Sequence, residues 1–525
     1  MHSSLLFLLL STAPSILTTA QDFPPIDLGY ATHKPTFVNT TSTGTKVGLY
    51  NNIRFAQPPT GALRFRKPRT PPSNETGVQD GRVRLFASDC VSAVHPGAPF
   101  PGINGTTWGQ EDCLFLNVWV PEGVKAGDKV PVLHWLHGSA WAFGSKDLFG
   151  DGFGLFDAMD EEGRFIFVAS NYRMGLYGWT SSARGDMDAN AGLFDAVAAL
   201  EWTKKYIARF GGDPDRVTAM GQSAGASMIT LMLVANGGNA TLPFQKALLS
   251  STGLMPRRNV TERREYVFDQ ALKAANCSSA SCLRNASSST LVDANKELLM
   301  GLQGGSGGGT IGPGIGLGPV PDGKYITDAA TVLLQQGRFN KNIKAVISGN
   351  TAAEGFGMTG DVSTLDDFAR MVRGLVPGAS NATVRRIRQM YPYPDSQMQT
   401  VAEAWTTDVV YACNLRAVAS AYGNRTHRYV FSVPPANHGL DSYYYFYRED
   451  AELPVTNPSL AREFQKKLLD ILVSDDNDDD WPLYQPGSKA ANITLDGIKK
   501  SVDPWARKHN CDVIMKIIMD RKNGA

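Results

Sequence analysis

A serine between two glycines is the feature of this sequence that most directly suggests chemistry, because a hydroxyl on a sharp turn can act as a nucleophile. The pattern Gly-x-Ser-x-Gly occurs twice, at 221–225 and at 304–308. Residues 216–220 before the first copy predict a strand, and residues 226–233 after it predict a helix. The second copy lies in a glycine-rich stretch where neither element is expected. The strand-to-helix context therefore predicts that Ser223 of the first copy is the nucleophile.

A serine hydroxyl needs a general base, and His427, His438 and His509 follow Ser223 in the chain. On strand-to-helix turns of this kind the catalytic groups come in the order serine, acid, histidine. His438 lies in a loop directly after the predicted strand 429–433, where such a base is expected. His427 adjoins a glycosylation sequence and His509 lies in a polar tail, so we expect both at the surface.

The acid that orients the histidine is predicted to follow another strand end. Glu354 comes shortly after the predicted strand 345–348, from which it can reach a histidine on a neighbouring strand. On position alone, Asp322 and Asp328 are equally placed. The residues by themselves leave this choice open.

Donors for a developing oxyanion are predicted upstream of the serine. The predicted strand 132–136 runs into a loop, 137–141, which contains small residues. Such a loop can direct backbone N–H groups at a substrate oxygen. The alternative is an ordinary tight turn.

Short apolar runs alternate with longer amphipathic segments in the middle of the chain. Residues 130–136, 165–169 and 217–220 predict buried strands, and residues 196–210 predict a helix. This alternation indicates an α/β fold with a large, mostly parallel sheet flanked by helices. With no repeat and no Pro/Ser-rich linker, residues 21–525 are expected to form a single domain.

Composition and charge argue against several classes of protein. The 525 residues are 42% hydrophobic and 19% charged, as in a folded chain, and the net charge is only +1. Without a cluster of Lys and Arg we expect no nucleic-acid partner. The six cysteines, Cys90, Cys113, Cys277, Cys282, Cys413 and Cys511, show no zinc-binding spacing, so we expect no metal and instead disulfides of undetermined pairing.

The N-terminus predicts export. Residues 1–20 combine the apolar run 5–10 with small residues at Thr18 and Ala20, as in a cleavable signal peptide, although a buried N-terminal helix is the alternative. No later stretch approaches the roughly 20 apolar residues of a membrane span, so the mature protein is expected to be secreted and soluble, without stable membrane insertion. Candidate N-glycosylation sites are Asn39, Asn74, Asn104, Asn239, Asn259, Asn276, Asn285, Asn381, Asn424 and Asn492.

Two segments have biased compositions. Residues 301–318 contain ten glycines, which predicts a surface loop or, as the alternative, a lid over the substrate. Residues 475–480 read Asp-Asp-Asn-Asp-Asp-Asp and predict a solvated acidic loop, since they lack the spacing of a calcium-binding loop.

Several ordered blocks give the chain a resemblance to the type-B carboxylesterase/lipase family, which includes cholinesterases and fungal lipases. The resemblance extends from about residue 30 to near the C-terminus and implies the α/β-hydrolase fold. The blocks are Phe55–Gly61 with Arg64 and Phe65, Glu111–Trp119, Asn171–Gly175, Phe210–Pro214, Pro319–Gly323 and Trp481–Pro482.

The resemblance also implies roles for individual residues. Glu354 matches the acid of the family, although Asn350 and Thr351 are shifted against its usual pattern, and His438 matches the histidine. Backbone N–H groups of Ser139, Ala140 and Ala224 would then form the oxyanion hole. The implied disulfides are Cys90 with Cys113, Cys277 with Cys282, and Cys413 with Cys511.

Three positions depart from the family pattern. Ser139 and Ala140 stand where relatives often carry glycine, which predicts a tighter pocket beside the acyl group. Gln222 is neutral where the residue before the nucleophile is often glutamate. Trp108 does not match the position of the choline-binding tryptophan. Choline esters are therefore unexpected substrates.

The predicted function is hydrolysis of a small-molecule or lipid ester through an acyl-enzyme on Ser223, without a cofactor. The alternatives are a lipase acting on longer acylglycerols and a tailoring esterase or acyltransferase for a secreted metabolite. A non-enzymatic adhesion protein, as found among the relatives of such esterases, is less expected because all three catalytic residues are present. The sequence makes no prediction of oligomeric state.

Overall fold

A computed structural model describes residues 23–523 except 85, 97–102, 104, 149–150, 160–163, 185, 256–257, 259, 302–316, 474–480 and 508. The predicted signal peptide, the second Gly-x-Ser-x-Gly copy and the acidic segment 475–480 lie outside the described residues. Most of the glycine-rich segment and two sequons, Asn104 and Asn259, also lie outside them.

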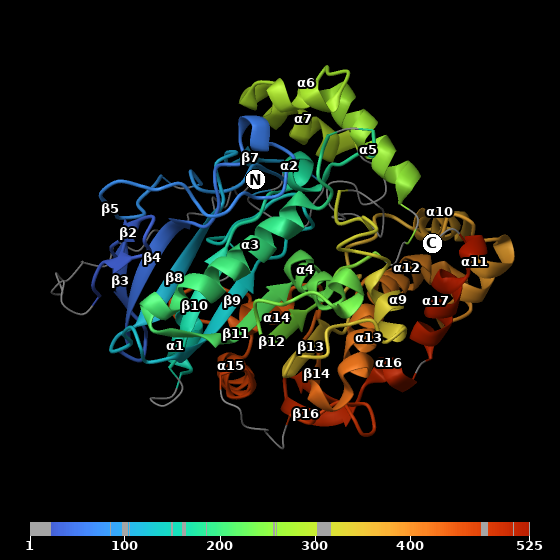
Figure 1. The fold of residues 1–525 in the computed structure, drawn as a ribbon. Coiled ribbons are helices and arrows are strands. Elements are labelled where there is room, and N and C mark those ends of the chain that lie inside the picture. Colours follow the sequence, from blue (N-terminus) through green and yellow to red (C-terminus); the bar gives the residue numbers. More distant parts are fainter. Residues whose placement is uncertain are drawn as a thin grey trace, which may run out of the picture.

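An 11-stranded mixed sheet runs through the molecule (Figure 1). Its order is β16-β15-β14-β13-β12-β11-β9-β10-β8-β4-β3. The strands from β10 to β15 in this order pair in parallel, while β8, β4 and β3 at one edge and β16 at the other pair antiparallel. The expectation of a large, mostly parallel sheet is confirmed.

The strands of this sheet come from most of the chain. Their bounds are β3 (Phe37–Thr40), β4 (Lys46–Arg54), β8 (Phe115–Pro121), β9 (Val130–Leu136), β10 (Ile166–Ser170), β11 (Gly212–Gln222), β12 (Lys246–Ser250), β13 (Ala345–Thr351), β14 (Thr426–Phe431), β15 (Lys489–Thr494) and β16 (Gly497–Val502). Short strands β1 (Ile26–Asp27), β2 (Thr32–His33) and β5 (Val78–Gln79) form a second sheet, and β6 (Ser92–Ala93) pairs with β7 (Thr107–Trp108).

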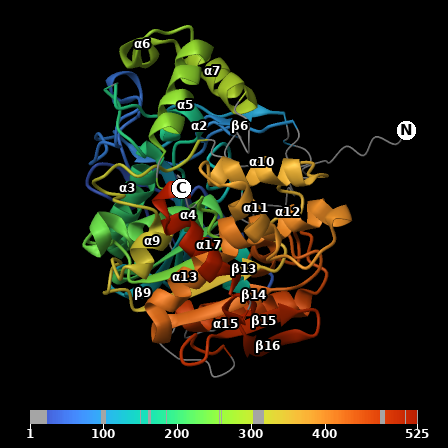
Figure 2. The same ribbon diagram turned by 90° about the vertical axis from the view of Figure 1, so that its right-hand side faces the viewer.

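Helices cover the sheet on both faces and extend beyond it. They are α1 (Phe153–Asp157), α2 (Gly175–Trp179), α3 (Ala191–Tyr206), α4 (Ala224–Leu233), α5 (Thr261–Ala274), α6 (Ala280–Asn285), α7 (Ser288–Gly301), α9 (Ala330–Gln335), α10 (Leu365–Leu375), α11 (Asn381–Arg388), α12 (Met398–Thr406), α13 (Cys413–Tyr422), α14 (Leu440–Tyr445), α15 (Pro458–Leu472), α16 (Pro504–Arg507) and α17 (Asn510–Met519). Helices α5, α6 and α7 form one outlying group, and α10, α11 and α12 another (Figures 1 and 2). No helix in the described part of the chain is both long and apolar enough to cross a membrane.

The central strands are buried on both faces, as their apolar runs predicted. In β9, Val132 and Leu136 belong to the core that includes side chains of α3 and α4, while Leu133 and Trp135 belong to the core of α14 and α15. Side chains alternate between the faces of a strand, so one short apolar run supplies both cores. This packing fixes the register of the strands whose carboxyl ends carry the candidate site.

The three disulfides that the family resemblance implied are formed, joining Cys90 to Cys113, Cys277 to Cys282 and Cys413 to Cys511. Most of the described sequons are exposed. Asn492 differs because it lies in β15, half-buried, and its side-chain oxygen accepts a hydrogen bond from Ser432 Oγ at 2.7 Å.

Candidate active site

Ser223 occupies the turn between β11 and α4, in a backbone conformation that side chains rarely adopt. Its φ is 54° and its ψ is −118°, and its N–H donates to the carbonyl of Ser250 at 2.9 Å. A Cβ atom on Gly221 would collide with the backbone of Gly225, and one on Gly225 would collide with the carbonyl of Leu136. Both glycines are therefore required by the close approach of the chain, and the turn holds the serine at the carboxyl end of the sheet.

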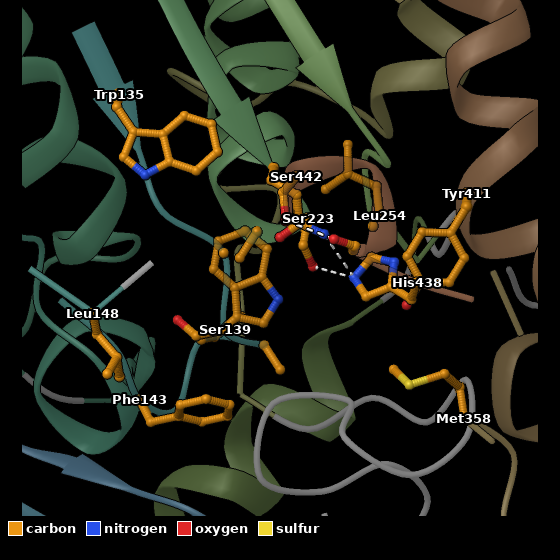
Figure 3. A pocket seen from close by; sticks show the side chains of 18 of the residues that line it. Trp135, Ser139, Phe143, Leu148, Ser223, Leu254, Met358, Tyr411, His438 and Ser442 are labelled. Carbon is orange, nitrogen blue, oxygen red and sulfur yellow. Dashed lines mark hydrogen bonds between the residues drawn. The ribbon is translucent and has the colours of Figure 1, made fainter. Parts of the chain in front are cut away.

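His438 lies beside this serine, with its Nε2 atom 2.9 Å from Ser223 Oγ (Figure 3). The residue follows β14, the strand end at which the sequence placed it. On its other side, Nδ1 lies 2.6 Å from Glu354 Oε2. The structure thus brings Ser223, His438 and Glu354 into one hydrogen-bonded chain.

Glu354 is fully buried, and both of its carboxylate oxygens are engaged. Oε2 faces His438, while Oε1 accepts hydrogen bonds from Ser251 Oγ at 2.6 Å and from the N–H of Thr351 at 2.8 Å. A buried carboxylate needs such partners, because an unpaired charge in the interior is costly. The loop that carries it is tied to the histidine loop by the N–H of Ala353, which donates to the Ala436 carbonyl at 2.9 Å.

The other sequence candidates lie elsewhere. Asp322 accepts hydrogen bonds from the N–H groups of Lys324 and Ile326 in a turn, and Asp328 forms a bidentate ion pair with Arg258. In the described part of the chain neither aspartate contacts His438, which Glu354 reaches, so the geometry favours Glu354 among the three acids.

The prediction that His427 lies at the surface is wrong. His509, at the start of α17, is exposed as predicted. His427 is buried, and its Nδ1 lies 2.9 Å from the carbonyl oxygen of Trp481. The neighbouring sequon at Asn424 is exposed, but β14 begins two residues later between β13 and β15. An interior strand is covered on both faces, which accounts for the burial.

The loop after β9 has an unusual backbone. Ser139, Ala140 and Trp141 have φ values of 123°, 56° and 67°. Within the described residues, no hydrogen bond uses the N–H of Ser139 or Ala140. Ala224 is the first residue of α4, so its N–H has no partner within the helix. These are the three N–H groups expected at an oxyanion hole.

Buried aromatic contacts hold this loop in place. The hydroxyl of Tyr172 donates to the carbonyl of His137 at 2.8 Å, and the two rings stack with centroids 4.5 Å apart. Burial lowers the pKa of His137 to about 4, so this ring is neutral near pH 7. The anchoring offsets part of the strain of three successive residues with positive φ, a conformation that costs of order 1–3 kcal/mol for each residue.

A cavity of about 350 Å³ opens above Ser223. Apolar side chains line it on both sides of the serine, with Trp135, Phe143 and Leu148 on one side and Tyr411 and Met358 on the other (Figure 3). Ser139 and Ala140 also line the cavity, and the tighter pocket expected from their side chains stays a prediction. Trp108 is not among the lining residues; its Nε1 donates to Asp89 at 3.1 Å.

Three residues that contact the candidate site residues or lie close to them were not predicted from the sequence. Ser251, whose hydroxyl binds Glu354, directly follows β12, so the strand-end rule could have found it. Tyr411 packs against His438 with ring centroids 4.6 Å apart and comes from a π-helical segment, Thr407–Ala412. No sequence pattern used above indicates such a segment. The third residue is Asp441.

Asp441 is a buried carboxyl group close to the hydrogen-bonded chain of Ser223, His438 and Glu354. Its Oδ2 accepts hydrogen bonds from Ser250 Oγ at 2.7 Å and from the hydroxyl of Tyr429 at 2.6 Å, while the buried Oδ1 has no hydrogen-bond partner among the residues that the structure describes. Burial, reinforced by the nearby Glu354, raises the pKa of Asp441 to about 6. The carbonyl of Ser250 also accepts the N–H of Ser223, so Asp441 stabilises the strand end that holds Ser223.

The sequence of this chain matches a known protein family. A model described as the carboxylesterase family matches residues 36–470. The chain belongs to this carboxylesterase family. It is a carboxylic ester hydrolase that acts on ester substrates.

Several relatives of this carboxylesterase are fungal enzymes. It is 30% identical to carboxylesterase patB of Penicillium expansum, with 91% of this chain and 93% of the relative covered. It is 32% identical to lipase 1 of Geotrichum candidum over 66% of this chain and 67% of the relative. Several other relatives are named secreted lipases.

The carboxylesterase also has a solved structural neighbour, EstA of Aspergillus niger. The TM-score is 0.79 at 23% identity, and the match covers 97% of this chain and 100% of that chain. This likeness confirms the α/β-hydrolase fold.

Replacing Ala140 by glycine should widen the cavity beside Ser223, because the removed methyl group lines it. We expect kcat/KM for esters with a branched acyl group to rise about five- to tenfold relative to the linear isomer, the lower end of the about 1–3 kcal/mol that one methyl group is worth in a pocket. Paired assays of isobutyrate and butyrate p-nitrophenyl esters measure this ratio. Ala451→Gly, in a different segment of the cavity wall, serves as the control. An unchanged ratio in Ala140→Gly would contradict the expectation.

Asp441→Asn should change how stability depends on pH. The pKa of Asp441 in the folded protein, about 6, exceeds the value of about 3.8 for the free side chain. As pH rises from 4 to 7 the unfolded chain loses this proton first, so wild-type stability falls by about 2 kcal/mol relative to a variant that cannot ionise there. Urea unfolding of both proteins between pH 4 and 7 measures the difference. Parallel stability curves would show that Asp441 ionises normally.

Proposed function

We propose that this protein is a secreted serine esterase that uses Ser223 as nucleophile, His438 as general base and acid, and Glu354 as the orienting carboxylate. One observation carries the proposal: Ser223 Oγ, the imidazole of His438 and the carboxylate of Glu354 form a continuous hydrogen-bonded chain at the base of an apolar cavity. Membership of the carboxylesterase family supports the same chemistry.

Acylation begins when Ser223 Oγ attacks the ester carbonyl and its proton passes to His438 Nε2. The buried carboxylate of Glu354 stabilises the imidazolium that forms. The carbonyl oxygen becomes an oxyanion, which accepts hydrogen bonds from the N–H groups of Ser139, Ala140 and Ala224. Removing one such donor typically costs about 3 kcal/mol of transition-state stabilisation. The alcohol then leaves with the proton from Nε2.

Deacylation repeats these steps with water in place of the serine. His438 takes a proton from the water as it attacks the acyl carbonyl, and returns the proton to Ser223 Oγ as the acid product departs. This scheme uses only side chains and backbone groups of the chain.

Export is part of the proposal. Residues 1–20 would be removed as a signal peptide, and residues 21–525 would form the mature catalytic domain. Three disulfides support an oxidising compartment, since disulfides seldom persist in the cytosol. Relatives named as secreted lipases support it as well.

Ser223→Ala should reduce hydrolysis of p-nitrophenyl butyrate by at least about 10⁴-fold, because loss of the nucleophile removes the acyl-enzyme route. Labelling by a fluorophosphonate probe should disappear in parallel. Ser459→Ala, which alters an exposed serine on α15, is the control and should retain labelling. Persistent labelling of Ser223→Ala would contradict the assignment.

Lipase activity is the second candidate function, and the apolar lining of the cavity favours it. The named lipase relatives support it too. A true lipase should show kcat/KM that rises with acyl length from C2 to C12, and activity on emulsified triglyceride that rises sharply once an oil phase forms. Initial rates across that series and across triglyceride solubility measure both. If kcat/KM is highest for C2 to C4 acyl groups and the rate does not increase on emulsified triglyceride, the lipase function is contradicted and only the esterase function remains.

A further inference from the structure

Gln222, the last residue of β11, connects the two loops that flank the nucleophile. A Cβ atom on Gly138, in the loop after β9, would collide with its Oε1. On the histidine side, its Nε2 lies 3.2 Å from Nε2 of His438, and a Cβ atom on Gly439 would lie 3.4 Å from it. The side chain also lines the substrate cavity. Its amide therefore sits between the oxyanion loop and the general base.

We propose that Gln222 is a positioning residue that holds the imidazole of His438 through its uncharged amide, so that Nε2 stays available to accept the serine proton. The inference rests on the proposed function, in which His438 is the general base. It assigns a role to a side chain that takes no part in the bond-making steps described above.

The hydrogen bonds around His438 determine which nitrogen carries the proton. The carboxylate of Glu354 can only accept a hydrogen bond, so Nδ1, at 2.6 Å, is the protonated nitrogen of the neutral ring. Nε2 then offers its lone pair to two donors, Ser223 Oγ at 2.9 Å and the amide of Gln222 at 3.2 Å. A donor that binds the lone pair stabilises the neutral ring against the imidazolium.

His438 already has acidic groups close to it, so it matters that the side chain at position 222 carries no charge. Glu354 already contacts the ring from the loop after β13, and Asp441 lies nearby on α14. The ring of Tyr411 packs against the imidazole from the π-helical segment, and burial raises the pKa of that phenol, so it carries no charge near pH 7. A carboxylate at position 222 would add a further negative group beside Nε2 and favour the imidazolium, which cannot accept the serine proton.

The amide of Gln222 can form a hydrogen bond with His438 both when the imidazole is neutral and when it is protonated. Neither a carboxylate nor a thioether can do so. It donates an N–H to Nε2 while the ring is neutral. After Ser223 has passed its proton to Nε2, a rotation about the last torsion angle of Gln222 presents Oε1 as an acceptor for the new N–H. No atom is transferred to or from the amide in this exchange. Gln222→Glu retains the acceptor but adds charge, whereas Gln222→Met retains the length and loses both hydrogen bonds.

The test is the pH profile of kcat/KM for p-nitrophenyl butyrate between pH 5 and 9. We expect the acid limb of Gln222→Glu to move upward by about one pH unit, so that activity on that limb falls about tenfold while the plateau changes less. Gln222→Met should show a smaller upward shift and a plateau kcat reduced about five- to tenfold at similar KM. Gln397→Glu, which adds the same charge at an exposed position, should match wild type.

The outcomes separate this inference from the proposed function. If wild type hydrolyses the ester and Ser223→Ala does not, the proposed function stands. An acid limb of Gln222→Glu that coincides with wild type would then overturn the role of Gln222 alone. If wild type lacks activity that depends on Ser223, both proposals fail. Fluorophosphonate labelling of each variant at pH 8.5 checks that the site is folded. A variant that is not labelled is replaced in the comparison by Gln222→Asn, which keeps an uncharged amide at this position. We expect its acid limb to match that of wild type.

Discussion

The hydrogen bond from the N–H of Ser223 to the carbonyl of Ser250 is the interaction on which the candidate site depends. It ties a backbone with positive φ to the end of a neighbouring strand, and that conformation is tolerated because Gly221 and Gly225 leave room for the chain. Strain of this kind persists only where the surroundings enforce it. The hydroxyl of Ser250 donates in turn to Asp441, so a buried carboxyl group stabilises the strand end to which Ser223 is bonded.

The other side chains of the candidate site follow the ends of neighbouring parallel strands, so short loops are enough to bring them together. Strands β11, β12, β13 and β14 are neighbours in the sheet, and their carboxyl ends lead to Ser223, Ser251, Glu354 and His438 respectively. Ligand and catalytic sites of open α/β sheets form at this edge because the loops after successive parallel strands meet there. The large separations of these residues in sequence are therefore compatible with distances of 2.6–2.9 Å between their side chains.

Much of this arrangement could be predicted from the sequence, because strand ends and the order of serine, acid and histidine are local signals. The predicted strand 130–136 matches β9 at both ends, whereas the predicted helix 196–210 begins earlier, as α3, and ends in a 3₁₀ turn. Local signals failed where neighbours in space decide the outcome. His427 is buried because of the strands on either side of it, and the contact of Gln222 with His438 depends on two loops far apart in sequence.

The π-helical segment that carries Tyr411 lies between α12 and α13, in a run of helix that continues on both sides. A π-turn accommodates one more residue than an α-turn, so such segments behave as single-residue insertions in a helix. Loss of one residue there would rotate α13 relative to α12 by about 100° unless the helix repacked. The disulfide of Cys413, the first residue of α13, resists that rotation. Length variation among homologues should therefore avoid this segment, even though no residue in it takes part in bond-making.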